Sequence, residues 1–190
     1  MDRIWMKGLI LIVCGLLWMV PAQAAAGPPK SGEALPDFQL AVPGDSGDRD
    51  YLGLSRGGSF QVPQIQARVV IIEIFSMYCP FCQKEAPNIN RLHRLIEENP
   101  DLKGKIKLIG IGAGNSSYEV GIFKTRYGVS FPLFPDGEYA VHSLLGSVRT
   151  PYFIAVKING DGTHRIIYSK LGAFEAPESF LRLIVKSAGL

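Results

Sequence analysis

The residues of this sequence best suited to chemistry are Cys79 and Cys82, which are separated by two residues. The run Val69–Phe75 before them is apolar and β-branched, which is typical of a buried parallel strand, and a helix is expected to begin at Pro80. A cysteine at the cap of that helix faces free backbone N–H groups and the positive end of the helix dipole, which favour its thiolate form. Cys82 follows one turn later on the same face, within the span of a disulfide. The spacing therefore predicts a dithiol that opens and closes reversibly.

A zinc site is the main structural alternative for this cysteine pair, which would supply half of the ligands. The sequence contains no second C-x-x-C pair and no nearby pair of histidines to complete four ligands. We expect His93, His142 and His164 to be surface or packing residues. Redox chemistry without a metal or an organic cofactor is therefore the prediction for Cys79 and Cys82.

Two acidic residues near the cysteines are candidates for moving protons. Glu73 lies inside the apolar run, so we expect it to be buried, with a raised pKa, and to pass a proton to or from Cys82. The alternative for Glu73 is a solvated position at the end of a strand. Glu85 is expected on an exposed turn of the helix, either as a second proton carrier or only as a solvated charge near the helix N-terminus.

Four residues are candidates for contact with a substrate. Tyr78 and Phe81 flank Cys79, where they either line an apolar docking surface or simply pack. Pro151 has no backbone N–H, and this leaves the backbone of Thr150 free to pair with an extended substrate peptide.

The N-terminus carries the pattern of a secretory signal, which we assign to residues 1–24. A positively charged start precedes the apolar run 8–20, and residues 22–24 fit an A-x-A cleavage site. An uncleaved N-terminal anchor is the alternative. Lipidation at Cys14 is weaker, because Val13 stands where a lipoprotein signal has a small residue.

The rest of the chain reads as a linker and one domain. Residues 25–36 are small and rich in proline and glycine, so we expect a flexible linker, and residues 37–190 suit a single domain. The formal net charge of +3 is small, and the charges are scattered, so nothing indicates binding to nucleic acid. Once the signal is removed, Cys79 and Cys82 are the cysteines that remain, which fits an oxidising compartment such as the periplasm and leaves none for a structural disulfide.

The hydrophobic pattern predicts an α/β domain in which the cysteines lie between the first strand and the first helix of a β-α-β unit. That helix contains Pro87, which is expected to kink it. Ser116 and Glu119 form a capping-box pattern that opens an extra helix. The further elements expected are a hairpin of strands 38–42 and 59–62, a strand at 106–111, an extended piece at 131–134, a short helix at 138–145, a hairpin of strands 152–158 and 165–169, and a closing helix at 177–188.

Taken together, these positions resemble the thioredoxins. Glu73 stands six residues before the first cysteine, where thioredoxins have a buried acid, and Pro87 stands five after the second, where they have a helix-kinking proline. Thr150 and Pro151 precede the last hairpin, where thioredoxins have a cis-proline that faces the disulfide, and Gly172 follows that hairpin as their glycine does. The resemblance implies a thioredoxin-like fold: a central mixed sheet flanked by helices, here with an N-terminal β-hairpin and an extra helical segment after the first β-α-β unit.

Within the thioredoxins, the chain looks most like the TlpA/ResA-like thiol-disulfide oxidoreductases. The export signal, the N-terminal hairpin, the extra segment 114–131 and a threonine before the cis-proline carry this likeness, and Glu85 matches an acid near the site in that group. Two departures stand out: the group usually has an amide at the position of Glu73, and a tryptophan-rich strand end in place of residues 74–78. The Pro80-Phe81 dipeptide is closer to that of glutaredoxin-like and DsbA-like sites, which leaves the direction of electron flow open.

The resemblance implies an enzyme of the cell envelope that reduces substrate protein disulfides by dithiol exchange. It further implies a monomer, a membrane thiol-disulfide relay that re-reduces the site, and substrates that include apocytochromes c awaiting haem attachment. A DsbA-like oxidant or isomerase uses the same residues, but the chain shows neither an inserted helical domain nor a dimerisation domain. A peroxiredoxin is disfavoured because Ile72 occupies the place of that family's motif proline, although Ser76 stands three residues before Cys79. A copper chaperone on the same fold needs a third ligand, for which His142 is the candidate.

Overall fold

The computed structural model describes residues 27–190. The predicted signal 1–24, its alternative as an anchor, and Cys14 therefore lie outside the described residues. Across residues 27–190, none of the helices combines the length and the apolar character that crossing a membrane requires.

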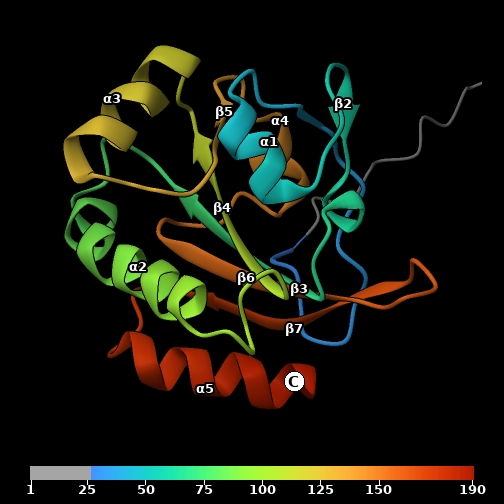
Figure 1. The fold of residues 1–190 in the computed structure, drawn as a ribbon. Coiled ribbons are helices and arrows are strands. Elements are labelled where there is room, and N and C mark those ends of the chain that lie inside the picture. The colour runs from blue at the N-terminus through green and yellow to red at the C-terminus, as the bar shows by residue number, and fades with distance from the viewer. Residues whose placement is uncertain (1–26) are drawn as a thin grey trace, which may run out of the picture.

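A five-stranded mixed sheet forms the centre of the domain, in the order β5-β4-β3-β6-β7 (Figure 1). The strands β3, β4 and β5 are parallel, whereas β6 and β7 are antiparallel to their neighbours. Every residue of β3 and β4 is buried, as expected for strands covered on both faces by other elements. The bounds of the strands are β3 Val69–Phe75, β4 Ile106–Ala113, β5 Leu133–Asp136, β6 Tyr152–Ile158 and β7 His164–Leu171.

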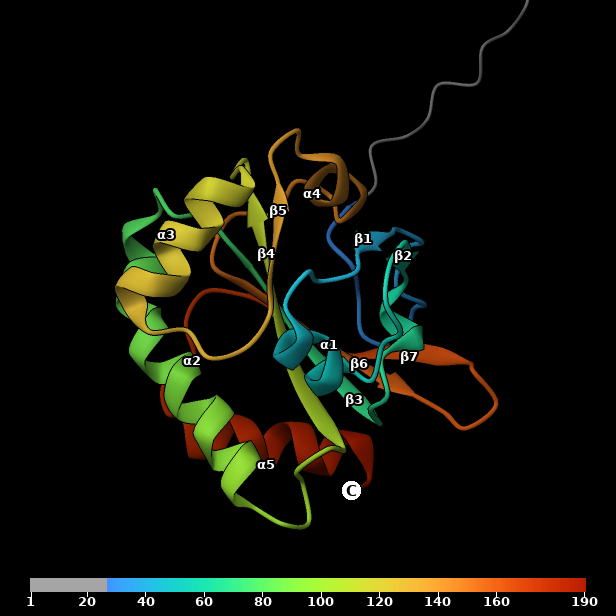
Figure 2. The same cartoon turned by 45° about the horizontal axis from the view of Figure 1, so that its top comes forward.

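Helices cover both faces of this sheet, and each face has its own hydrophobic core (Figure 2). The helices α2 (Pro80–Glu98), α3 (Ser117–Tyr127) and α5 (Pro177–Ala188) pack on one face. On the other face lie α1 (Ser46–Leu52), the small pair β1 (Leu40–Ala41) and β2 (Ser59–Phe60), the 3₁₀ turn η1 (Val62–Gln64) and α4 (Ala140–Leu144). This arrangement confirms the predicted α/β architecture, including the extra helix after the first β-α-β unit.

The start of α2 follows the local signals in the sequence. Cys79 is the N-cap residue with extended backbone angles, and Pro80 occupies the first turn. Its missing N–H costs no hydrogen bond there, because the first N–H groups of a helix have no acceptor within the helix. Pro87 lies inside the helix, as predicted. The capping box of α3 is also formed, since Ser116 and Glu119 each accept a hydrogen bond from the other's backbone N–H.

The prediction of an N-terminal hairpin is confirmed in the pairing of its two strands and wrong in the segment that connects them. β1 and β2 do pair antiparallel, but α1 lies between them, where the sequence analysis expected only turns. The Asp45 side chain caps this helix by accepting a hydrogen bond from the Asp48 N–H, and Leu52 at its end is completely buried. The burial of Leu52 stabilises a helix that is too short to be predicted from local pattern alone.

Residues 25–36 were predicted to be a flexible linker, but the described part of this segment, residues 27–36, packs on the domain. The Gly32 N–H donates to the Ile166 carbonyl and the Ile166 N–H donates to the Glu33 carbonyl, each at 2.8 Å. Leu35 is buried, with 4% of its surface exposed. β7 is the last strand of the sheet, so this segment satisfies backbone groups that an edge strand otherwise leaves unpaired.

Candidate active site

The structure places the two cysteines in different surroundings at the start of α2. Cys79 is half-buried, and its thiol donates a hydrogen bond to the Thr150 carbonyl with a sulfur–oxygen distance of 3.3 Å. Cys82 has no exposed surface and belongs to the core beneath the helix. Both are free thiols. One sulfur can therefore meet a partner from solution, while the other is reached through the first.

The two thiols also differ in acidity. Partial burial acts to raise the pKa of Cys79, but hydrogen bonds with the side chains of Thr150 and Cys82 and with the backbone of Cys82 and Phe81 outweigh it, so that its pKa is lowered. Burial raises the pKa of Cys82, and the charge of Glu73 raises it further. The exposed cysteine is thus the one that favours the thiolate, which is the nucleophilic form.

Glu73 is buried in the middle of β3, with 2% of its surface exposed. It lies between Gly110 of β4 and Phe153 of β6, and its Oε1 atom has no hydrogen-bond partner among residues 27–190. Burial, followed by the charges of Glu85 and Cys79, raises the pKa of Glu73 to about 8. A carboxyl group with such a pKa exchanges its proton near neutral pH.

Glu85 is not on an exposed turn, as the sequence analysis expected, but is buried with 3% of its surface exposed. The segment between β7 and α5 covers this turn, and the Phe174 N–H donates to one carboxylate oxygen at 3.4 Å. The Asn88 side chain donates to the other oxygen at 3.3 Å. Burial raises the pKa of Glu85, while these two hydrogen bonds act to lower it. The structure therefore brings two buried acids, rather than one, to this part of the domain.

The four candidate substrate contacts lie around Cys79 or face it. The peptide bond between Thr150 and Pro151 is cis, and the Thr150 carbonyl is the acceptor for the Cys79 thiol. Tyr78 and Phe81 do not pack, since 65% and 67% of their surfaces are exposed. Two exposed aromatic rings beside a reactive sulfur form an apolar surface that a protein partner can cover.

The three histidines each lie close to a polar group other than the cysteines; for His164 this is the Leu35 carbonyl, 3.5 Å from Nε2. His93 is buried, with Nδ1 2.9 Å from the Ser130 hydroxyl, and His142 Nε2 lies 2.7 Å from the Val148 carbonyl. Within residues 27–190, no three His, Cys, Asp or Glu side chains are grouped so as to hold a metal ion.

Two amide side chains near the cysteines were missed by the sequence analysis. Asn115 Oδ1 accepts a hydrogen bond from the Met77 N–H, and the Gln83 side chain donates to the Met77 carbonyl, both at 2.8 Å. Asn115 lies 38 residues from Met77 along the chain. No local pattern reveals such a contact, because it depends on how β4 and α2 are placed in the fold.

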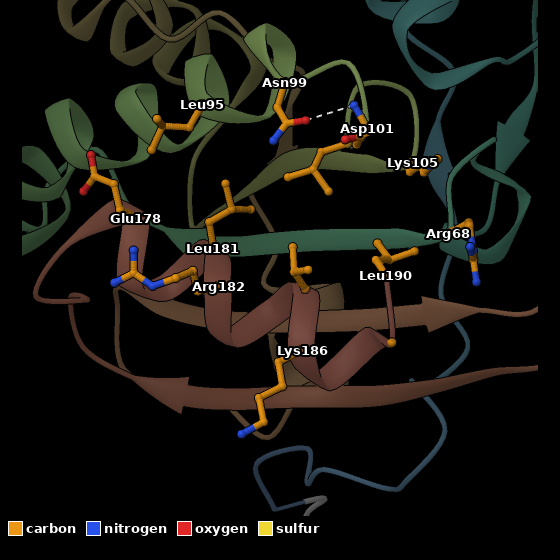
Figure 3. Close-up of a pocket in the computed structure, with 13 residues that line it drawn as sticks. Arg68, Leu95, Asn99, Asp101, Lys105, Glu178, Leu181, Arg182, Lys186 and Leu190 are labelled. Carbon is orange, nitrogen blue, oxygen red and sulfur yellow. Dashed lines mark hydrogen bonds between the residues drawn. The ribbon is translucent and has the colours of Figure 1, made fainter.

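A groove lies elsewhere, between α2 and α5 (Figure 3). Its volume is about 800 Å³, and Leu95, Leu181 and Val185 are among the residues that line it. The lining includes Asn99, which follows the last residue of α2, whereas Cys79 precedes the first. This groove is therefore separate from the dithiol.

Comparison with known proteins agrees with this geometry. The family described as Redoxin matches residues 30–183 of the chain. The chain belongs to the Redoxin family. The matched segment of this redoxin contains both cysteines, both buried acids and the cis-proline.

The redoxin is similar to known thiol-disulfide oxidoreductases. It is 25% identical to thiol-disulfide oxidoreductase ResA of Halalkalibacterium halodurans over 160 residues, and this aligned segment covers 84% of each chain. A solved structure from Chlorobium tepidum, described as a DsbE thiol:disulfide interchange protein, matches with a TM-score of 0.63 at 18% identity, over 85% of this chain and 99% of that one. A secreted disulfide oxidoreductase of Mycobacterium tuberculosis matches with a TM-score of 0.54 at 16% identity, over 78% of this chain and 95% of that one. These likenesses confirm the predicted thioredoxin-like fold and the resemblance to ResA-like proteins.

The asymmetry of the two thiols predicts selective alkylation. In the reduced redoxin at pH 7, iodoacetamide is expected to modify Cys79 at least about tenfold faster than Cys82, because Cys79 is more exposed and forms the thiolate more readily. Mass spectrometry of peptides after brief exposure measures the ratio. In urea, where both thiols are exposed, the two rates are expected to converge. Equal rates in the folded protein would contradict the assignment of Cys79 as the reactive thiol.

Proposed function

We propose that this redoxin is a thiol-disulfide oxidoreductase that reduces disulfides in substrate proteins outside the cytoplasm. The observation that carries the proposal is the pairing of an accessible Cys79 whose pKa is lowered with a buried Cys82 whose pKa is raised, three residues apart at a helix N-terminus. Such a pair supplies one attacking sulfur and one resolving sulfur. Membership of the Redoxin family and the likeness to ResA support the same activity.

In the first step, the Cys79 thiolate attacks one sulfur of the substrate disulfide. A disulfide forms between Cys79 and the substrate, and the second substrate sulfur leaves as a thiolate that takes up a proton. The lowered pKa of Cys79 raises the fraction of thiolate present at neutral pH. Hydrogen bonds at the helix start hold that sulfur in place for the attack.

In the second step, Cys82 loses its proton and attacks the Cys79 sulfur. The substrate leaves as a dithiol that has gained two electrons and two protons, and the redoxin keeps a Cys79–Cys82 disulfide. Glu73 is the group that takes the proton of Cys82, since its charge acts on the pKa of Cys82 and its own pKa of about 8 suits exchange near neutral pH. Glu85, fixed by two hydrogen bonds, raises the pKa of Glu73.

The substrate binds as an extended peptide beside Thr150 and Pro151. This proposal is supported by the position of the Thr150 carbonyl, which already faces the Cys79 sulfur. The exposed rings of Tyr78 and Phe81 add apolar contact on the helix side. Backbone pairing with apolar side contacts suits many substrate sequences rather than one.

The location and partners follow from the sequence pattern. The signal-like segment 1–24 and the ResA relatives support a protein of the periplasm or another extracytoplasmic space, with a membrane anchor as the alternative. There, a membrane thiol-disulfide relay returns two electrons to the Cys79–Cys82 disulfide, and apocytochromes c are candidate substrates. The domain 37–190 carries the activity as a monomer.

A disulfide oxidant or isomerase is the second candidate function, and two observations favour it. The dipeptide Pro80-Phe81 resembles that of DsbA-like sites. The lowered pKa of Cys79 stabilises the dithiol form, which makes a disulfide more oxidising. The raised pKa of Cys82 acts in the opposite direction, so the balance between the two cysteines sets the potential.

The reduction potential of the Cys79/Cys82 pair distinguishes the two functions. We expect the purified mature protein, equilibrated at pH 7 against dithiothreitol or glutathione couples, to give about −270 mV or lower, the value of thioredoxin. Thiol-specific mass tagging measures the oxidised fraction, with the Cys82→Ser variant as a control that cannot form the pair. A potential of about −180 to −120 mV would contradict the reductant proposal and support the oxidant or isomerase.

A further inference from the structure

The backbone of Met77, two residues before Cys79, forms a hydrogen bond through its N–H and another through its carbonyl. Its N–H donates to Asn115 Oδ1 at 2.8 Å, and its carbonyl accepts a hydrogen bond from the Gln83 side chain at 2.8 Å. Asn115 belongs to the connection between β4 and α3, whereas Gln83 belongs to the first turns of α2. The segment before Cys79 is therefore fastened both to its own helix and to a separate part of the fold.

Asn115 is placed for this contact by its own surroundings. It has no exposed surface, and its backbone N–H donates to the Gly112 carbonyl at 3.0 Å, which turns the chain back at the end of β4. A side chain at Gly112 would crowd it, because a Cβ atom there would lie 3.1 Å from Asn115 Cβ. Its Nδ2 atom has no hydrogen-bond partner among residues 27–190. Burying the Nδ2 group without a partner is unfavourable, and the hydrogen bond that Oδ1 accepts from the Met77 N–H offsets part of this cost.

The start of α3 touches the next residue of the same segment. Glu119 accepts a hydrogen bond from the Tyr78 hydroxyl, and its other carboxylate oxygen is held by Ser116. The Cys79 N–H in turn donates to the Ser76 carbonyl at 3.0 Å, which closes the turn that leads into α2. Asn115 and Glu119, which lie just before α3 and in its first turn, thus hold positions 77 and 78. The conformation of the turn 76–79 determines where the Cys79 side chain points.

We propose that Asn115 is a positioning residue of the dithiol site: by binding the Met77 N–H, it holds the turn 76–79 so that the Cys79 sulfur meets the first turn of α2 beside Thr150. The Asn115 side chain forms no hydrogen bond with the reacting sulfur among residues 27–190. The inference rests on the proposed function, since it concerns the residue that makes Cys79 an effective nucleophile.

The physical consequence concerns the hydrogen bonds that stabilise the Cys79 thiolate. They involve the backbone of Phe81 and Cys82 as well as the side chain of Thr150, and a hydrogen bond weakens steeply when its angle is lost. If the Met77 N–H has no acceptor, the turn 76–79 is free to rearrange toward water. The sulfur then spends less time aligned with these groups, and the thiolate becomes less favourable.

The chain offers a matched control in Asn90. This asparagine is also buried, makes one hydrogen bond from its side chain to the backbone, to the Tyr127 carbonyl at 2.8 Å, and leaves its other polar atom without a partner among residues 27–190. It fastens the last residue of α3, whereas Asn115 precedes α3 and reaches the turn before Cys79. Leucine at either position removes one buried side-chain hydrogen bond, so both variants are expected to lose stability.

The experiment compares Asn115→Leu with Asn90→Leu in the full chain. We expect the rate of Cys79 alkylation by iodoacetamide at pH 6.5 to fall about three- to tenfold in Asn115→Leu, with its pH midpoint moved upward, since each unit of pKa changes the thiolate fraction tenfold below the midpoint. Asn90→Leu is expected to keep the midpoint of the unmodified protein. A midpoint for Asn115→Leu equal to that of Asn90→Leu would overturn the proposal.

Gln83→Leu tests the other hydrogen bond of the Met77 backbone if Asn115→Leu does not fold. This variant removes the contact to the Met77 carbonyl and is expected to move the alkylation midpoint upward as well; an unchanged midpoint would overturn the shared role. The two failures remain distinct. If the unmodified protein cannot cleave a model disulfide, the proposed function fails, whereas unchanged Cys79 reactivity in the variants of an active protein rejects only the role of Asn115.

Discussion

Replacement of Cys79 by serine is expected to lower the rate at which the reduced redoxin cleaves a disulfide by at least about a thousandfold, because a serine hydroxyl is not ionised near neutral pH and forms no stable bond to sulfur. Cys82 cannot replace it. That thiol has no exposed surface, and burial together with the charge of Glu73 raises its pKa. A chromogenic aromatic disulfide, mixed with stoichiometric reduced protein, measures the rate through its coloured thiolate.

The Cys82→Ser variant is the matched control for this experiment. It keeps the attacking sulfur and removes the resolving one, so it is expected to cleave the reagent once and to retain half of it as a mixed disulfide on Cys79. Mass spectrometry detects that adduct. Substantial cleavage by the Cys79→Ser variant, or an adduct on Cys82, would reverse the order in which the two cysteines act.

Local signals were sufficient to predict the part of the site that is close in sequence. The β-branched run Val69–Phe75 predicted a buried strand, and Pro80 after Cys79 predicted the start of a helix with a cysteine at its cap. The burial of Glu73 followed from its place in that run. These features depend on residues within about one strand and one helical turn, where steric preference and hydrophobic period dominate.

Features that depend on distant segments were not predictable in this way. The burial of Glu85 arises from Phe174, which follows β7, and the anchoring of Met77 arises from Asn115, at the end of β4. The packing of residues 27–36 depends on the free edge of β7 at Ile166. In each case, the sequence around the residue is compatible with exposure, and only the tertiary arrangement supplies the partner.

The second large effect concerns Glu73, whose replacement by glutamine is expected to stabilise the reduced protein above neutral pH. The folded-state pKa of about 8 exceeds the ordinary value of 4.5, so between these values the folded protein keeps a proton that the unfolded chain has released. The free energy of unfolding therefore falls as the pH rises through this window, by about 1.4 kcal/mol for each pH unit. Glutamine is neutral at every pH and removes this slope.

Urea unfolding of the reduced protein at pH 5 and at pH 8 measures the effect. Glu73→Gln is expected to be more stable than the unmodified protein by about 2 to 4 kcal/mol at pH 8, with a much smaller difference at pH 5, where the glutamate is protonated in the folded state. The same variant is expected to turn over about ten- to a hundredfold more slowly, because the proton of Cys82 has lost its acceptor. A gain in stability joined to a loss of activity distinguishes a catalytic carboxyl group from a structural one.

Glu85→Gln provides the comparison that isolates Glu73. Glu85 accepts hydrogen bonds from Phe174 and Asn88, which favour its charged form against burial, so its replacement is expected to change the pH dependence of stability less. Because the charge of Glu85 raises the pKa of Glu73, Glu85→Gln is also expected to move the pH profile of turnover to lower pH. If Glu73→Gln keeps the pH slope of the unmodified protein while Glu85→Gln removes it, Glu85 holds the buried proton, and the assignment of Glu73 as the acceptor from Cys82 is wrong.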